Sequence, residues 1–297
     1  DYQTIETHAR NFTKGAIAVR EGMVRDNALL LSLAAQLNDA TSIQVIEWFR
    51  NLKIISGIRE EGYKGFTMSK TKDPLHKLKM LELLKAADLG IQDIKLEMLN
   101  IDELPKDMPK ELRDRLIRES KEENTEIFSD IITTHKKYNN DRQFVENSFL
   151  SMDDDESSGT QKFFALTGPI LDVLENGFSL VVDELDSKLH PNLICKLVSL
   201  FNSKELNPKD AQLIFNTHDT NLLSSGLFRR DQIWFTEKNK FGEARLYSLA
   251  DFKTDEVRKS EPFEENYIRG KYGAIPFLDT FDDLISTKLA LNNENEK

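Results

Sequence analysis

The stretch from residue 178 to residue 184 joins a buried-strand pattern to two carboxylates that could do chemistry. Phe-Ser-Leu-Val-Val is mostly apolar, as a strand buried in a parallel sheet is, and Asp183 and Glu184 follow directly. Ligands bind at the carboxyl ends of strands in open α/β sheets. Asp183 could hold Mg²⁺ through its water shell, and Glu184 could orient or deprotonate a water that attacks a phosphate. A strand that ends in an ordinary acidic turn is the alternative, and these residues alone leave it open.

Two neighbouring segments favour the chemical interpretation. Upstream, Ser-Gly-Thr-Gln at 158–161 opens a helix with apolar periodicity, and a helix N-terminus attracts phosphate through its free N–H groups and its dipole. Downstream, a second buried strand over 211–215 leads to Thr-His, with the histidine at position 218. The intervals between the segments leave room for one helix and one strand each.

The order of these segments resembles the second lobe of an ABC-type ATPase head. Glu-Ser-Ser-Gly-Thr-Gln at 156–161 stands where transporters carry Leu-Ser-Gly-Gly-Gln. Asp-Glu-Leu-Asp-Ser-Lys-Leu-His-Pro at 183–191 and Asn-Thr-His-Asp at 216–219 are similar to motifs of the SMC-like, AAA-family ATP-binding proteins of bacterial phage defence. Such proteins occur in Septu-like systems and near abortive-infection genes. The resemblance covers roughly residues 131–280, including the segments 231–235 and 271–276.

The resemblance implies an α/β fold, a P-loop NTPase of the ABC/SMC-head type with a mostly parallel central sheet, flanking helices and a helical insertion. It divides the chain into four parts: the remainder of an N-terminal ATPase lobe (1–57), a helical insertion or arm (58–130), a lobe with the signature, Walker B and switch-histidine motifs (131–280), and a tail (281–297). The polar end of the tail is expected to be disordered.

The same resemblance implies how nucleotide is bound. Two heads dimerise and sandwich two ATP molecules between them. Ser158 and Gly159, with the helix start that follows, would hold the γ-phosphate of the ATP bound to the opposite subunit. Thr160 and Gln161 complete this nucleotide-binding signature.

The resemblance also implies roles for the residues after the two strands. Asp183 would hold the Mg²⁺ shell, Glu184 would polarise the attacking water, and His218 would contact the γ-phosphate. Asp186 would lie in the loop that links the two nucleotide sites. His190 precedes a proline, and we expect it to start a helix rather than to bind a ligand.

The chain contains no Walker A motif, Gly-x-x-x-x-Gly-Lys-Ser/Thr. The nearest match, 57–65, has Tyr63 in place of the lysine and two glutamates that would repel phosphate, so we expect a flexible loop there. A Gly-Lys pair at 270–271 fails as well. Because the family carries the motif near its N-terminus, we expect Asp1, which is no initiator methionine, to lie downstream of it. The motif is then missing from this sequence, on a separate chain, or lost with nucleotide binding, and the intact later motifs disfavour loss.

Composition limits the classes of function. The net charge of −11 argues against a uniformly basic nucleic-acid binder, although a local basic patch leaves nucleic acid open as a partner. The apolar runs are too short to span a membrane, and the polar start at residue 1 shows no signal peptide. The one cysteine, Cys195, lies in an apolar-periodic helix, where we expect it in the core. We therefore expect a soluble, cytoplasmic protein.

The remaining segments give expectations for single elements. Helices are expected over 28–37, buried nearly all round, and over 43–52. The charged helix at 110–123 is either a solvated insertion or an arm that contacts a partner. A strand over 131–138 is expected near a sheet edge, with His135 at the surface, and residues 231–249 are expected to form a hairpin.

These observations together predict an ATPase subunit with ATP and Mg²⁺ as its cofactors, which hydrolyses ATP only when it is completed by a Walker A segment that this sequence lacks. It would form a homodimer or higher oligomer through its heads, sense infection, and control a separate nuclease or toxin effector, since the chain shows no effector site of its own. An SMC-like DNA-repair ATPase is one alternative, although the sequence lacks the long coiled coil that such a protein predicts. The other alternative is a scaffold that docks an effector without hydrolysing nucleotide.

Overall fold

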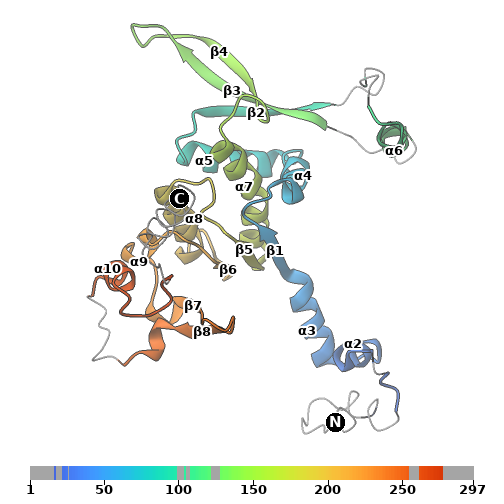
Figure 1. Ribbon diagram of the computed structural model, residues 1–297. Coiled ribbons are helices and arrows are strands. Elements are labelled where there is room, and N and C mark those ends of the chain that lie inside the picture. The colour runs from blue at the N-terminus through green and yellow to red at the C-terminus, as the bar shows by residue number, and fades with distance from the viewer. Residues whose placement is uncertain are drawn as a thin grey trace, which may run out of the picture. The chain divides into compact units, whose positions relative to one another are not determined.

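The computed structural model (Figure 1) divides the chain into two compact units, Asp1–His218 and Asp219–Lys297. The tail expected over 281–297 lies outside the described residues. The described residues are 17, 22–25, 27–98, 104, 108–121, 128–253 and 261–276.

A three-stranded parallel sheet forms the centre of the first unit (Figure 1). Its strands lie in the order β1 (Leu52–Ser56), β5 (Ser179–Asp183) and β6 (Gln212–Phe215), and all neighbours are parallel. Leu180 and Val182 of β5 are buried, and each contributes about 1.5–3 kcal/mol by leaving water. The two strands expected from the sequence are confirmed, and β1 adds a third beside them.

One long helix, α7 (Ser158–Asn176), fills the core next to the sheet. It begins where expected, because the Ser157 hydroxyl accepts a hydrogen bond from the Thr160 N–H at 3.1 Å. It ends at Gly177, whose φ of 71° is the left-handed conformation that glycine adopts without strain. Most of the helix between its two ends is buried, so α7 is the main hydrophobic support of the unit.

The helix α4 (Glu61–Lys70) crosses α7 closely. A side chain on Gly168 would overlap Thr67, so the crossing requires a glycine there. Pro169 has no N–H for the carbonyl four residues earlier, and the Thr67 hydroxyl donates to that carbonyl, of Ala165, at 2.5 Å. The expectation of a flexible loop over 57–65 is therefore wrong, because residues 61–65 form the start of α4.

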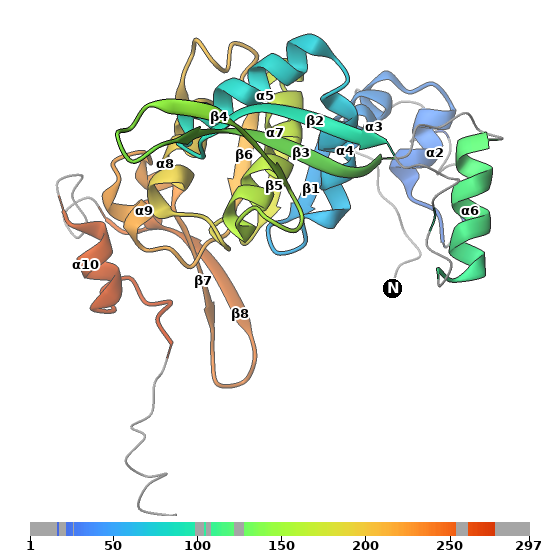
Figure 2. The ribbon, with the colours of Figure 1, turned by 90° about the horizontal axis from the view of Figure 1, so that it is seen from above.

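A second sheet is antiparallel, in the order β2 (Ile91–Met98), β3 (Phe128–Tyr138) and β4 (Phe144–Ser151). β3 and β4 form a long hairpin (Figure 2). The sequence placed residues 91–98 in a helical insertion, but they form an edge strand. β3, expected near an edge, is the central strand, and its two lysines, Lys136 and Lys137, lie toward the tip of the hairpin.

The first helices of the unit are α2 (Leu30–Gln36) and α3 (Ala40–Asn51), close to the expected ranges. The burial expected for the first one is wrong, since only Ala34 of α2 is buried. No helix in the described part of the chain combines the length and the apolar character needed to cross a bilayer. The remaining helices of the unit are α5 (Pro74–Ala86), α6 (Lys110–Lys121) and α8 (Pro191–Asn202).

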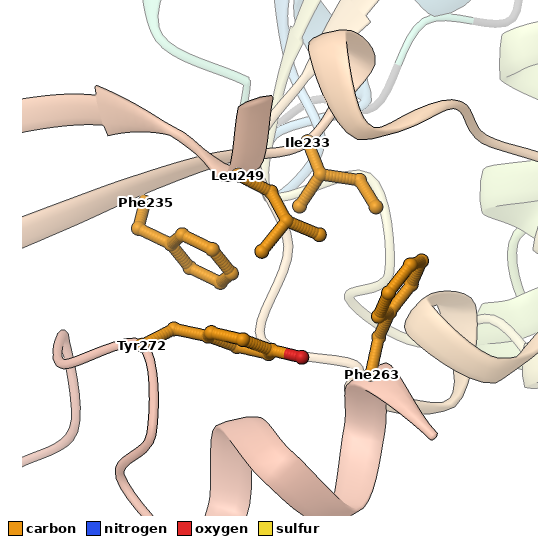
Figure 3. Packing of buried hydrophobic residues seen from close by; sticks show 5 residues of the cluster. All are labelled: Ile233, Phe235, Leu249, Phe263 and Tyr272. Carbon is orange, nitrogen blue, oxygen red and sulfur yellow. The ribbon is translucent and has the colours of Figure 1, made fainter. Parts of the chain in front are cut away.

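The second unit has a small core of its own beneath the hairpin of β7 (Trp234–Lys238) and β8 (Ala244–Ser248). The hairpin confirms the one expected from the sequence. Figure 3 shows the side chains of this core, which are Ile233, Phe235, Leu249, Phe263 and Tyr272. The other elements of the unit are α9 (Asn221–Ser224), α10 (Phe263–Ile268) and the short 3-10 helices at Arg230–Gln232 and Leu249–Asp251.

Candidate functional site

The two acids after β5 lie at the carboxyl edge of the parallel sheet, as the sequence predicted. Ser56, the last residue of β1, pairs with Asp183 in the register of the sheet. The next residue, Gly57, donates its N–H to the Asp183 carbonyl at 2.5 Å, and a side chain there would overlap the Glu184 carbonyl. Glu184 itself has a φ of 54°, a left-handed conformation that is uncommon outside glycine. Backbone strain of this kind concentrates at functional sites.

Asn216, which the sequence analysis did not single out, holds both acids from the end of β6. Its side-chain amide donates to Asp183 Oδ1 at 2.6 Å, and its side-chain oxygen accepts the N–H of Glu184. Its backbone carbonyl accepts the N–H of Leu185 at 3.3 Å. One asparagine therefore fixes the direction of the first carboxylate and the backbone of the second. The sequence feature that could have indicated the role of Asn216 is a polar residue directly after a buried strand.

His218 and Asp186, predicted from the sequence to belong to one site, are brought together. The His218 N–H lies 3.4 Å from each carboxylate oxygen of Asp186. The histidine side chain is left exposed. The loops after β5 and β6 are thus joined at two points, since Asn216 makes the other connection.

The start of α7 carries the predicted signature residues. Ser158 and Gly159 occupy the first two helical positions, where no intrahelical carbonyl accepts their N–H groups. The Thr160 hydroxyl lies 2.9 Å from the Ser157 hydroxyl, and the Gln161 amide donates to the carbonyls of the preceding turn. Direct contacts of these four residues with nucleotide stay a prediction.

The signature and the loop after β5 meet within the subunit. A side chain on Gly159 would lie 2.9 Å from the carbonyl oxygen of Lys188, so a glycine is needed for this approach. The Lys188 ammonium is 2.7 Å from Glu60 Oε1. Burial raises the pKa of Glu60, but the hydrogen bond from Lys188 and the charges of Lys188 and Lys162 outweigh it and lower this pKa below its ordinary value.

Lys162 is a second residue that the sequence analysis missed. Its side chain is fully buried, and its ammonium donates to the carbonyls of Leu185 at 2.9 Å, Glu184 at 3.3 Å, and Ser187. Burial lowers the pKa of Lys162 to about 8, against the opposing attraction of the carboxylates near it. The signal was a lysine on the first turn of an otherwise apolar helix, and its effect is to tie α7 to the loop that carries Glu184.

Two histidines outside the acid pair have structural partners. His190 caps α8, with its Nδ1 accepting the Asn192 N–H at 3.2 Å, which confirms the expectation of a helix start. The surface position expected for His135 is wrong: the residue is half-buried, and its Nε2 lies 2.7 Å from Glu156 Oε1. Cys195, expected in the core, is only partly buried.

The residues at this edge fit Mg²⁺ and a phosphate ligand. Among the described residues, no group of three or more His, Cys, Asp or Glu gathers as a protein-only metal site. Mg²⁺ needs none, because it keeps several waters and is bound by one or two carboxylates together with substrate phosphates. Asp183 is exposed and is oriented by Asn216, so it offers one such carboxylate. The free amides at the start of α7 suit phosphate oxygens.

A comparison with known protein families gives a match. The family model described as "AAA domain, putative AbiEii toxin, Type IV TA system" matches residues 48–224, more than half of the chain. No curated protein matches the sequence. The matched range contains the parallel sheet, α7 and each residue of the site described above.

Proposed function

The chain belongs to this AAA-domain family, which points to a P-loop ATPase domain, and from that premise we propose that it hydrolyses ATP between two copies of itself. The observation that carries the proposal is the arrangement at the end of β5. Asn216 holds Asp183 and Glu184 with the two ends of one amide. An ordinary acidic turn needs no such support, because exposed carboxylates are stable in water.

Each residue after the parallel strands has a proposed role. Asp183 binds the Mg²⁺ shell, and Mg²⁺ supplies positive charge to the phosphate oxygens when it is bound. Glu184 orients the attacking water and takes up its proton. His218 contacts the γ-phosphate, and Asp186 holds the backbone of His218 in place.

The signature acts on the nucleotide of the other subunit in this proposal. Ser158 and Gly159 offer free N–H groups at the positive end of the α7 dipole, which suits the γ-phosphate. Thr160 and Gln161 shape the turn that presents them, because their side chains bond to that turn. The sequence contains no Walker A motif, so we propose that the remaining phosphate contacts come from outside these residues.

The finer assignment rests on the order of the motifs. We propose an SMC-like head of the ABC type, which senses infection in bacterial antiphage defence and controls a separate nuclease or toxin effector. Its support is the resemblance of 183–191 and 216–219 to that group, together with the toxin–antitoxin wording of the family description.

Substituting Glu184→Gln tests the proposed function, in a protein that also supplies the phosphate contacts proposed to come from outside these residues; the wild type and every variant are compared in that form. The amide keeps the size of the side chain and cannot accept the proton, so we expect turnover to fall by roughly 10²–10⁴-fold, the usual contribution of a general base. Steady-state phosphate release measures this turnover rate. ATP binding and ATP-dependent dimer formation, followed by calorimetry and light scattering, should survive.

The matched control is Glu175→Gln, since Glu175 is a carboxylate of α7 paired with Lys79 at 2.7 Å, at the opposite end of the helix from the signature. It should leave turnover unchanged. Wild-type turnover retained in Glu184→Gln would remove Glu184 from the mechanism, and a wild-type protein that never turns over ATP would support the scaffold alternative.

A further inference from the structure

We propose that His135 is a positioning residue for ATP hydrolysis, which through Glu156 sets the turn that presents Ser158. The inference rests on the proposed function. His135 belongs to β3, the central strand of the antiparallel sheet, and lies 21 residues before Glu156 in the sequence. Its contact connects that sheet to the signature.

The contact is a compact polar cluster. His135 Nε2 lies 2.7 Å from Glu156 Oε1, and the same oxygen accepts the hydroxyl of Thr133 at 2.7 Å. The side chain of Glu156 is only 8% exposed and that of His135 19% exposed. A carboxylate so far removed from water needs hydrogen-bond partners, because a buried polar group left without them is strongly destabilising.

Glu156 in turn holds the beginning of α7. Its N–H donates to the Ser151 carbonyl at 3.2 Å, and its own carbonyl accepts the Gln161 side chain at 3.1 Å. The following residue, Ser157, is the N-cap of the helix. The position of Glu156 therefore fixes both the cap and the first turn, where Ser158 lies.

Through the contact of His135 with Glu156 the antiparallel sheet can affect the position of Ser158 and so the rate of hydrolysis. His135 of β3 contacts Glu156, and Glu156 directly precedes the N-cap of α7. A change in His135 should therefore alter the presentation of Ser158 and leave Asp183 and Glu184 in place. A purely structural pair would lower stability and leave the rate of the bound complex unchanged.

The test compares His135→Ala with a matched control, His76→Ala. His76 lies 2.9 Å from Glu175 Oε2 near the other end of α7, and its side chain is similarly buried, at 16% exposed. We expect kcat to fall by about tenfold in His135→Ala with little change in KM, since a misplaced transition-state contact acts on kcat. His76→Ala should keep the kcat of the wild type.

Two further measurements make the result decisive. His135→Gln keeps an N–H donor for Glu156 and should recover most of kcat. Hydrogen exchange of the hydrogen-bonded amides at 160–162 should accelerate in His135→Ala and keep its wild-type rate in His76→Ala. Equal kcat values in the two alanine variants, or equal exchange at these amides, would overturn the role of His135. A wild type without turnover would overturn the proposed function instead, and with it this role.

Discussion

Two side chains hold the loop after β5, and both come from elements outside it. Asn216 binds the acids from the end of β6, and Lys162 binds three backbone carbonyls of the loop from α7. Glu184 has a left-handed backbone conformation, which costs of order 1–3 kcal/mol and persists only where the surroundings fix it. These two residues are that support, so the direction of the Glu184 side chain depends on residues distant in the chain.

The buried lysine predicts a specific pH dependence of stability. The pKa of Lys162 is about 8 in the folded chain, against an ordinary value of 10.5. Between these two values the unfolded chain binds a proton that the folded chain lacks, so folding becomes more favourable as pH rises. We expect the free energy of unfolding of the wild type, relative to Lys162→Met, to rise across this window.

Urea denaturation of both proteins from neutral pH to pH 10.5 measures the difference. Below the folded pKa both states carry the proton, and the difference should be constant there. Lys196→Met, which changes an exposed lysine of α8, serves as the control and should lack this rise. A flat difference for Lys162→Met would show that the lysine is not buried as described.

At the scale of elements, α7 connects three parts of the first unit. Its first turn carries the signature, Lys162 reaches the loop after β5, and its middle packs on α4 through Gly168. The helix also includes Pro169, whose missing hydrogen bond is replaced by the Thr67 hydroxyl. The signature therefore rests on a buried helix, which suits the phosphate contact to another subunit that we propose.

Mixing two inactive variants tests whether the signature acts between subunits. In a heterodimer of Ser158→Arg and Glu184→Gln, the intact Glu184 and the intact Ser158 belong to different chains. Action between subunits gives that heterodimer one complete site, and equal mixing should restore about a quarter of the wild-type rate in a two-fold symmetric dimer. Phosphate release from the mixed, reassembled proteins measures it.

The reciprocal mixture is the control. Here the wild type is paired with a chain that carries both Ser158→Arg and Glu184→Gln. This heterodimer has no complete site if the signature acts between subunits, and it has one complete site if the signature acts within its own chain. Activity in the second heterodimer and none in the first would contradict the proposal.

At the scale of the whole molecule, the two compact units have separate hydrophobic cores. In the second unit Tyr272 is 2% exposed and stacks on Phe235 with the ring centres 5.8 Å apart. The Asn266 side chain donates to the Tyr272 hydroxyl at 3.1 Å. The cores of the first unit are built from α7 and the two sheets, so we expect the units to lose structure separately.

Substituting Tyr272→Ala should destabilise the second unit alone. Removing a buried aromatic ring costs about 3–5 kcal/mol. Hydrogen exchange should therefore accelerate in β7 and β8 and stay unchanged in β5. Phe241→Ala, which removes a ring that is 78% exposed, is the control and should change neither. Equal acceleration in β5 and β7 would show that the two units unfold as one.

The sequence by itself determined the elements whose signals are local. An apolar run followed by acids is enough to predict β5 and its position at the sheet edge, because the apolar run and the polar residues that end it are adjacent in the chain. A serine cap predicts the start of α7, and a proline after His190 predicts the start of α8. The order of the motifs at 156–161, 183–191 and 216–219 can also be read directly from the sequence, because each motif is a short continuous segment.

Only the tertiary structure decided the features that depend on contacts between distant residues. Gly62 and Gly65 disfavour a helix, yet α4 forms because Tyr63 and Thr67 are buried in the core, where α4 crosses α7. The central place of β3 and the burial of His135 depend on strands paired at both of its edges. The roles of Asn216 and Lys162 have the same origin, since each binds backbone far away in the chain, and no local pattern encodes such a partner.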